Sequence, residues 1–113
     1  MLLIMLHTRL TQPREMSDTE FYSIWLEEGQ FALQALQTPS AMLKGVWKVA
    51  GLQEVYALFE VESPSELDRV LANVPMIKKG YGHMLEQRYQ LLSPYTDWVS
   101  LLEDIVKQKR RPI

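Results

Sequence analysis

Residues 17–39 decide the fold, and they read SDTEFYSIWLEEGQFALQALQTP. Ser17 and Glu20 have the spacing of a capping box, which predicts a helix that begins directly after Ser17. The residue before a proline disfavours helical geometry, so we expect this helix to run to about Gln37 and to end before Pro39. Its apolar side chains form one stripe, which predicts the face that meets the core. The stripe consists of Phe21, Ile24, Trp25, Phe31, Ala32, Ala35 and Leu36.

Glu28 lies near the middle of this apolar stripe, so its charge points where the core is expected. A buried carboxylate is costly unless it is protonated or paired, and burial raises its pKa toward the range of a general base. Glu28 is therefore either a catalytic base or one half of a structural ion pair. Its candidate partners are Lys44, Lys48, Arg9 or another cation. A different helix register or an opening to solvent would also account for its position.

The rest of the chain has the patterns of further strands and helices. Strands are expected at residues 2–9, 41–50, 54–61 and 84–92. Ser63 and Glu66 form a second capping box, which starts a helix that we expect to end at Pro75. Glycines and lysines predict a loop over residues 76–83, and a helical pattern returns over residues 96–108.

This order of elements predicts an α+β fold of the ferredoxin-like kind. Strand, helix, strand, strand, helix and strand follow one another, as in the ferredoxin-like βαββαβ sandwich. We therefore expect one ferredoxin-like domain over residues 1–94 and a C-terminal helical extension over residues 95–113.

Both faces of the first strand are largely apolar, which predicts a second copy of the chain. Alternation places Leu2, Ile4 and Leu6 on one face and Leu3, Met5 and His7 on the other. Helices in this fold cover one face, and a second copy stacked sheet-to-sheet is the simplest cover for the other. We expect a homodimer at least, forming a dimeric α+β barrel. The C-terminal helix is expected to extend the interface through Trp98, Leu101 and Ile105.

The second strand carries further candidates for a binding site. Alternation places Lys44, Val46 and Lys48 on one face and Gly45, Trp47 and Val49 on the other. A lysine between apolar positions is suited to an anionic substrate, but a solvent-facing lysine has the same pattern. Trp47 is either a flat pocket wall or a core residue. His7 either packs within the first strand or edges a pocket.

Composition and motifs exclude several classes of function. The net charge is -2 with the histidines neutral, which argues against a general nucleic-acid binder. Cysteine is absent, and no metal-ligand spacing or glycine-rich phosphate loop occurs, so we expect no metal, flavin or nicotinamide cofactor. The apolar start is too short for a signal peptide or a membrane span. We expect a cytoplasmic protein without a membrane partner.

Several short segments, taken in order, resemble the muconolactone isomerases. The run Trp47–Gly51 is similar to the Trp-Arg-(Ile/Val)-Ala-Gly segment of that family. The resemblance covers about residues 1–76 and rests on order and spacing together. It also includes Met1-Leu2, Pro13 to Met16, the step from Met16 to Glu28, Phe59-Glu60-Val61, Ser63, Glu66-Leu67 and Val74-Pro75.

The resemblance implies a cofactor-free enzyme of bacterial aromatic catabolism with a ferredoxin-like fold. Family members assemble as dimers or rings of dimers and shift a double bond in a five-membered lactone by removing and returning a proton. The helix glutamate thought to carry that proton corresponds to Glu28. Two positions depart from the family. Trp25 replaces a lysine, and Lys48 replaces an arginine, which loses bidentate carboxylate binding.

The leading hypothesis is a cofactor-free isomerase or lyase that acts on a small lactone, muconolactone-like, or on a related carbonyl compound. Glu28 would be the base, and Lys48 or Lys44 would hold an anionic group of the substrate. Trp25, Trp47 and His7 would line the pocket. A non-catalytic dimeric barrel that binds a small molecule is the first alternative. A cofactor-independent cyclase or oxygenase is the second, since fold does not fix function.

Overall fold

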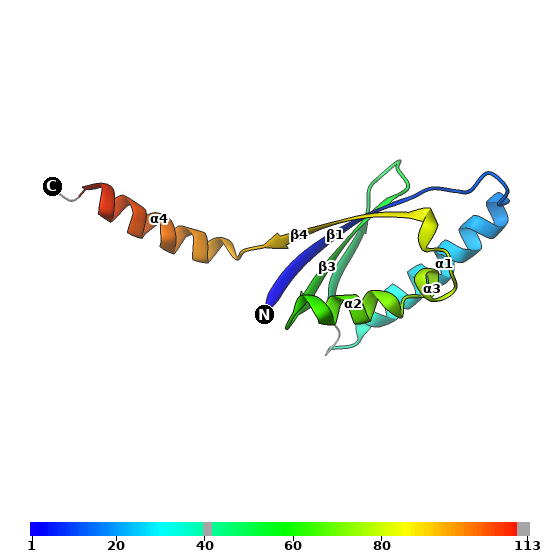
Figure 1. The fold of residues 1–113 in the computed structure, drawn as a ribbon, viewed down its shortest axis with the longest axis horizontal. Coiled ribbons are helices and arrows are strands. Elements are labelled where there is room, and N and C mark those ends of the chain that lie inside the picture. Colours follow the sequence, from blue (N-terminus) through cyan, green and yellow to red (C-terminus); the bar gives the residue numbers. More distant parts are fainter. Residues whose placement is uncertain (40–41, 111–113) are drawn as a thin grey trace.

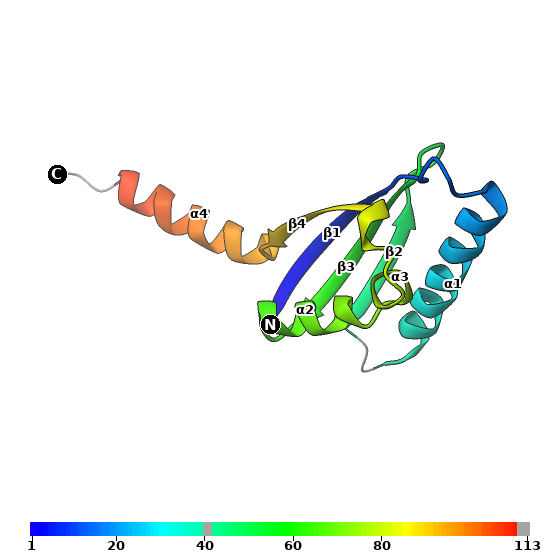
Figure 2. The same ribbon diagram turned by 45° about the vertical axis from the view of Figure 1, so that its right-hand side comes forward.

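The computed structural model describes residues 1–39 and 42–110, and its four strands and three longer helices follow one another in the expected order. The elements are β1 (Leu2–Leu10), α1 (Asp18–Gln37), β2 (Leu43–Lys48), β3 (Glu54–Val61), α2 (Pro64–Ala72), α3 (Pro75–Lys78), η1 (Gly82–Met84), β4 (Leu85–Leu92) and α4 (Tyr95–Arg110). The strands form one antiparallel sheet in the order β2-β3-β1-β4. Helices α1, α2 and α3 lie on one face of this sheet (Figures 1 and 2). The predicted ferredoxin-like α+β sandwich is confirmed.

Local sequence signals set the ends of the two long sandwich helices. The hydroxyl oxygen of Ser17 accepts the backbone N–H of Glu20 at 3.1 Å, and α1 ends at Gln37, before Pro39. The hydroxyl oxygen of Ser63 accepts the backbone N–H of Glu66 at 3.4 Å. Both capping boxes therefore start helices, as predicted.

The core lies between the sheet and the helices. Strand alternation turns one face of β1 toward the helices, where Ile4, Leu6 and Leu10 are buried. Two clusters of buried side chains follow along this layer. The first contains Ile4, Leu6, Phe59, Val61, Leu67 and Leu71, and the second contains Leu10, Phe21, Met76 and Met84. Phe21 is fully buried, whereas Phe31 and Leu36 of the same apolar stripe are 40% and 36% exposed, so the stripe of α1 meets the core only in part.

Residues 76–83 differ from the expected loop. Helix α2 already ends at Ala72, and Pro75 begins α3 instead of ending a helix. Proline suits the first position of a helix because that position needs no N–H donor. Gly80, which has φ +88°, follows α3, and the short 3-10 helix η1 leads into β4. The second strand is also shorter than expected, and position 41 lies outside the described residues.

The second face of the sheet carries no helix from the described part of the chain (Figure 2). Leu3, Met5 and His7 of β1 point to this face, which we call the open face. Helix α4 projects away from the sandwich along the longest axis, which measures 69 Å (Figure 1). None of its described residues is buried. No helix within residues 1–39 and 42–110 is long and apolar enough to cross a membrane.

Candidate functional site

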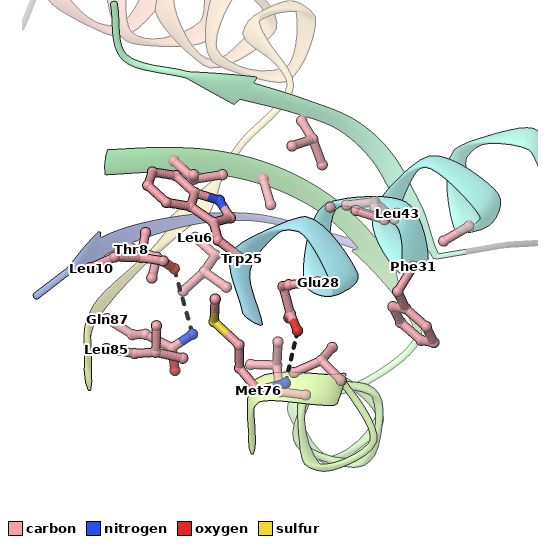
Figure 3. Close-up of a pocket in the computed structure, with 18 of the residues that line it drawn as sticks. Leu6, Thr8, Leu10, Trp25, Glu28, Phe31, Leu43, Met76, Leu85 and Gln87 are labelled. Atoms are coloured by element: carbon pink, nitrogen blue, oxygen red, sulfur yellow. Dashed lines mark hydrogen bonds between the residues drawn. The ribbon is translucent and has the colours of Figure 1, made fainter. Parts of the chain in front are cut away.

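A pocket of about 280 Å³ lies between α1 and the helix-facing side of the sheet (Figure 3). This size is close to the lower end of small-molecule sites, which begin at about 300 Å³. The sheet supplies apolar side chains that include Leu6, Val46, Val55 and Phe59. Helix α1 supplies Trp25, Glu28, Phe31 and Ala32, and the α2–α3 segment supplies Val70, Val74 and Met76. The walls are therefore mostly apolar, and the pocket suits a compact organic molecule.

Glu28 extends from α1 into this pocket, where a single backbone group holds it. The backbone N–H of Met76 in α3 donates to Glu28 Oε2 at 2.8 Å (Figure 3). Burial raises the pKa of the Glu28 carboxyl above its ordinary value, because desolvation penalises the charged form. The Met76 hydrogen bond lowers this pKa, and the neighbouring charge of Glu27 raises it. The net effect is a raised pKa, so the Glu28 carboxylate binds a proton more readily than an exposed glutamate does.

The ion pair that was one alternative for Glu28 does not form within the described residues. Their ion pairs join His7 to Glu54, Arg9 and Arg88 to Glu86, and Lys79 to Glu27. The ammonium of Lys48 donates instead to the carbonyl of Val49 at 3.0 Å. Among the described residues, no cation and no second hydrogen-bond donor contacts the Glu28 carboxylate, so the geometry does not support a structural ion pair there.

Of the other predicted site residues, Trp25 and Lys48 line the same pocket. The Trp25 indole packs edge-on against Phe21, with ring centroids 6.0 Å apart, and stands over the same cavity as Glu28 (Figure 3). Lys48 belongs to the sheet side of the pocket, but its side chain is solvent-exposed. The structure thus brings together Glu28, Trp25 and Lys48.

Lys44, Trp47 and His7, the other predicted site residues, do not line this pocket. A β-bulge between Leu43 and Gly45 shifts the alternation of β2, so Leu43 faces the pocket and Lys44 is exposed.

Trp47 and His7 belong to the open face, because alternation turns them away from the helices. Trp47 is 54% exposed, and its ring covers Gly45, where a Cβ atom would overlap it. His7 stacks on Tyr56 with ring centroids 4.5 Å apart, and its Nε2 lies 2.7 Å from Glu54 Oε1. Both side chains therefore lie on the opposite side of the sheet from the pocket.

Thr8 and Gln87 are pocket residues that the sequence analysis missed. They lie opposite each other in the β1–β4 pairing, and Gln87 Nε2 lies 3.5 Å from Thr8 Oγ1 (Figure 3). The alternation of β1 contained the signal, because Thr8 falls between Leu6 and Leu10 on the helix-facing side. Among the residues that the structure describes, no three His, Asp or Glu side chains are grouped as metal ligands.

An α+β sandwich with one acidic residue in an apolar pocket is the architecture of a small-molecule site. The family comparison is consistent with this class. The model of the muconolactone delta-isomerase family matches residues 2–90, and the chain belongs to that family. The family supports a small-molecule isomerase or a related catalytic role. No curated protein matches the sequence.

Solved structures share this fold at low sequence identity. A muconolactone isomerase is similar with a TM-score of 0.65 and 17% identity, over 81% of this chain and 88% of that chain. The 5-chloro-2-hydroxyhydroquinone dehydrochlorinase of Burkholderia phenoliruptrix AC1100, in complex with 2,5-dihydroxybenzoquinone, is similar with a TM-score of 0.54 and 15% identity. That match covers 80% of this chain and 93% of the dehydrochlorinase. At these identities the likeness establishes the fold.

Proposed function

We propose that this chain is a cofactor-free isomerase that shifts a double bond in a small lactone or related carbonyl compound. The observation that carries the proposal is Glu28, a carboxylate in an apolar pocket with no described cation beside it. A general base must reach the proton that it removes and must have a pKa suited to the task. Desolvation raises the pKa of Glu28 in the required direction.

The reaction needs two proton transfers by the same side chain. The Glu28 carboxylate removes a proton from a carbon that is activated by a carbonyl group. The C–H electron pair enters the conjugated system, and the carbonyl oxygen takes the negative charge of an enolate. Protonated Glu28 then returns the proton to a different carbon, and the double bond moves. Glu28 ends in its starting state, so the cycle consumes no co-reactant.

Trp25 and Lys48 have supporting roles in the proposed reaction. Trp25 supplies an apolar wall beside Glu28, and Lys48 supplies a cation at the exposed edge of the pocket. Lys44, Trp47 and His7 lie away from the pocket, and the proposed proton transfers do not use them.

We also propose that the protein is a homodimer, with the open faces of two sheets stacked together. The open face presents Leu3, Met5 and the exposed Trp47, and an apolar surface of this kind favours a partner. Helix α4 would add Trp98 and Leu101, which are 44% and 49% exposed. A cytoplasmic location and a place in aromatic catabolism stay predictions from the sequence.

Proton exchange tests the proposed function directly. Candidate lactones are incubated with the protein in deuterated water, and deuterium incorporation and double-bond position are followed by NMR. An isomerase should exchange the carbon-bound proton and should interconvert the two double-bond isomers. A protein that binds these lactones without any exchange above the buffer rate would contradict the proposal.

A further inference from the structure

The polar groups of the pocket are few, and they differ in kind. Among its described lining residues, the charged side chains are Glu28 and Lys48, the one side-chain amide is Gln87, and the one hydroxyl is Thr8. Glu28 stands on α1, while Thr8 and Gln87 stand side by side on the sheet (Figure 3). A bound molecule in this cavity would therefore meet an acid on one side and neutral hydrogen-bonding groups on the other.

The interior of the pocket offers little to a negative charge. Lys48 is the one cation among the described lining residues, and its side chain is exposed with its ammonium on the carbonyl of Val49. An anionic group inside would lose its hydration without gaining a cation. It would also share the cavity with Glu28, and two carboxylates in one site disfavour each other's charged forms. The pocket is therefore selective against anions.

Thr8 and Gln87 supply what a carbonyl oxygen needs. The Gln87 side-chain amide has two N–H donors, and one points at Thr8 Oγ1 from 3.5 Å. The Thr8 hydroxyl accepts that contact and keeps its own O–H donor. Both side chains come from paired strands, so the sheet fixes their separation. Donors held in this way can stabilise the oxygen of an enolate as its charge develops.

We propose that this pocket binds an uncharged, ring-sized carbonyl compound, with its carbonyl oxygen on Thr8 and Gln87 and an acidic C–H toward Glu28. This assignment rests on the proposed function and narrows its substrate class from lactones in general to neutral ones. When Glu28 takes the proton, the C–H pair becomes part of a C=C bond and the carbonyl electron pair moves onto oxygen. Thr8 and Gln87 then donate to that oxygen until Glu28 returns the proton.

A pair of ligands that differ by one charge tests the selectivity. Muconolactone, which is a carboxylate at neutral pH, is compared with its methyl ester by isothermal titration calorimetry on the full-length protein. We expect the ester to bind at least about tenfold more tightly, because no described group inside the pocket compensates a buried carboxylate. Equal or tighter binding of the carboxylate would overturn the assignment of a neutral substrate.

Two isosteric substitutions test the carbonyl site. Thr8→Val and Gln87→Leu should each weaken ester binding by about three- to tenfold, the effect of one lost neutral hydrogen bond. Gln34→Leu is the matched control, because Gln34 is an exposed residue of α1 that does not line the pocket. Unchanged ester binding in both pocket variants would refute the role of Thr8 and Gln87.

The same samples separate this inference from the proposed function. Deuterium exchange of the ester is measured beside its binding. Selective binding of the ester without exchange would refute the isomerase and leave the neutral-ligand site standing. Exchange of the carboxylate at least as efficient as that of the ester would refute the neutral-ligand site and leave the isomerase standing.

Discussion

Replacing Glu28 by glutamine removes the proposed base while it preserves the shape of the side chain. The amide oxygen of glutamine can still accept the backbone N–H of Met76, which now lies 2.8 Å from Glu28 Oε2. The link between α1 and α3 is therefore retained. The variant loses the ability to take up a proton at the pH of the assay. Activity and stability should respond in different ways.

The structure sets the size of both responses. Loss of a positioned general base costs about 10² to 10⁴ in rate. For stability, a hydrogen bond to a charged group is worth about 1 kcal/mol more than a neutral one, which favours the parent. Relief of the desolvation of a charge that has no described cation beside it favours the variant. These terms oppose each other, so Glu28→Gln should shift the free energy of unfolding by less than about 1 kcal/mol, or about 5 °C in Tm.

Two further variants complete the assay. Glu20→Gln is the matched control, because Glu20 is an exposed acid of the same helix that does not line the pocket. It should keep full exchange activity. Glu28→Ala leaves the Met76 N–H without its acceptor and should cost about 1–3 kcal/mol of stability.

Deuterium exchange and thermal melting are measured for each variant. The catalytic assignment of Glu28 is refuted if Glu28→Gln exchanges at the parental rate. A large fall in the Tm of Glu28→Gln would instead assign Glu28 to a structural role that needs its charge.

Three other predictions concern pH, assembly and metal content. Because folding raises the pKa of Glu28 above its ordinary value, the stability that this group contributes is present below the unfolded pKa and is lost as pH rises through the folded pKa. The Tm of Glu28→Gln minus that of the parent should therefore be more positive at pH 7 than at pH 4, and a difference that is constant or falls with pH would contradict this. Light scattering should give a dimer or larger assembly, and a compact parental monomer at micromolar concentration would count against the dimer. Deletion of residues 95–113 should reduce assembly or solubility. An unchanged oligomer and melting curve after this deletion would count against a role of the C-terminal helix in the interface. Metal analysis should find no stoichiometric transition ion, and about one ion per chain would overturn that expectation.

The fold was predictable because its signals are local and agree with one another. Ser17 and Ser63 each cap a helix, and Pro39 limits the first one. The alternation of β1 predicts that Ile4 and Leu6 share one face, and both side chains are buried on the helix-facing side of the sheet. The short helix that begins at Pro75 was not predicted, because a proline is compatible both with the end of one helix and with the first position of the next.

The candidate site was predictable only in part, for reasons that lie in tertiary geometry. Glu28 and Trp25 follow from the helical period alone. The predicted face of Lys44 was wrong because a bulge between Leu43 and Gly45 interrupts the alternation of β2. No pattern of residues in this segment predicts the bulge. The Met76 N–H could not be foreseen, since it depends on how α3 packs against α1. Thr8 was visible in the pattern but carries no charge to attract notice.

Neighbouring residues of β1 serve the two proposals separately, because they lie on opposite faces of the sheet. One face lines the pocket, and the other is the proposed dimer interface. On β1, Thr8 turns toward the pocket, while its neighbour His7 turns to the open face and stacks on Tyr56. A one-residue slip of this strand would exchange the two sets of side chains and destroy both surfaces. The pairing of β1 with both β3 and β4 resists such a slip, since two registers would have to change together. The position of Thr8 opposite Gln87 is therefore fixed by the same backbone hydrogen bonds that hold the sheet, and no flexible loop is needed to place the groups that face Glu28.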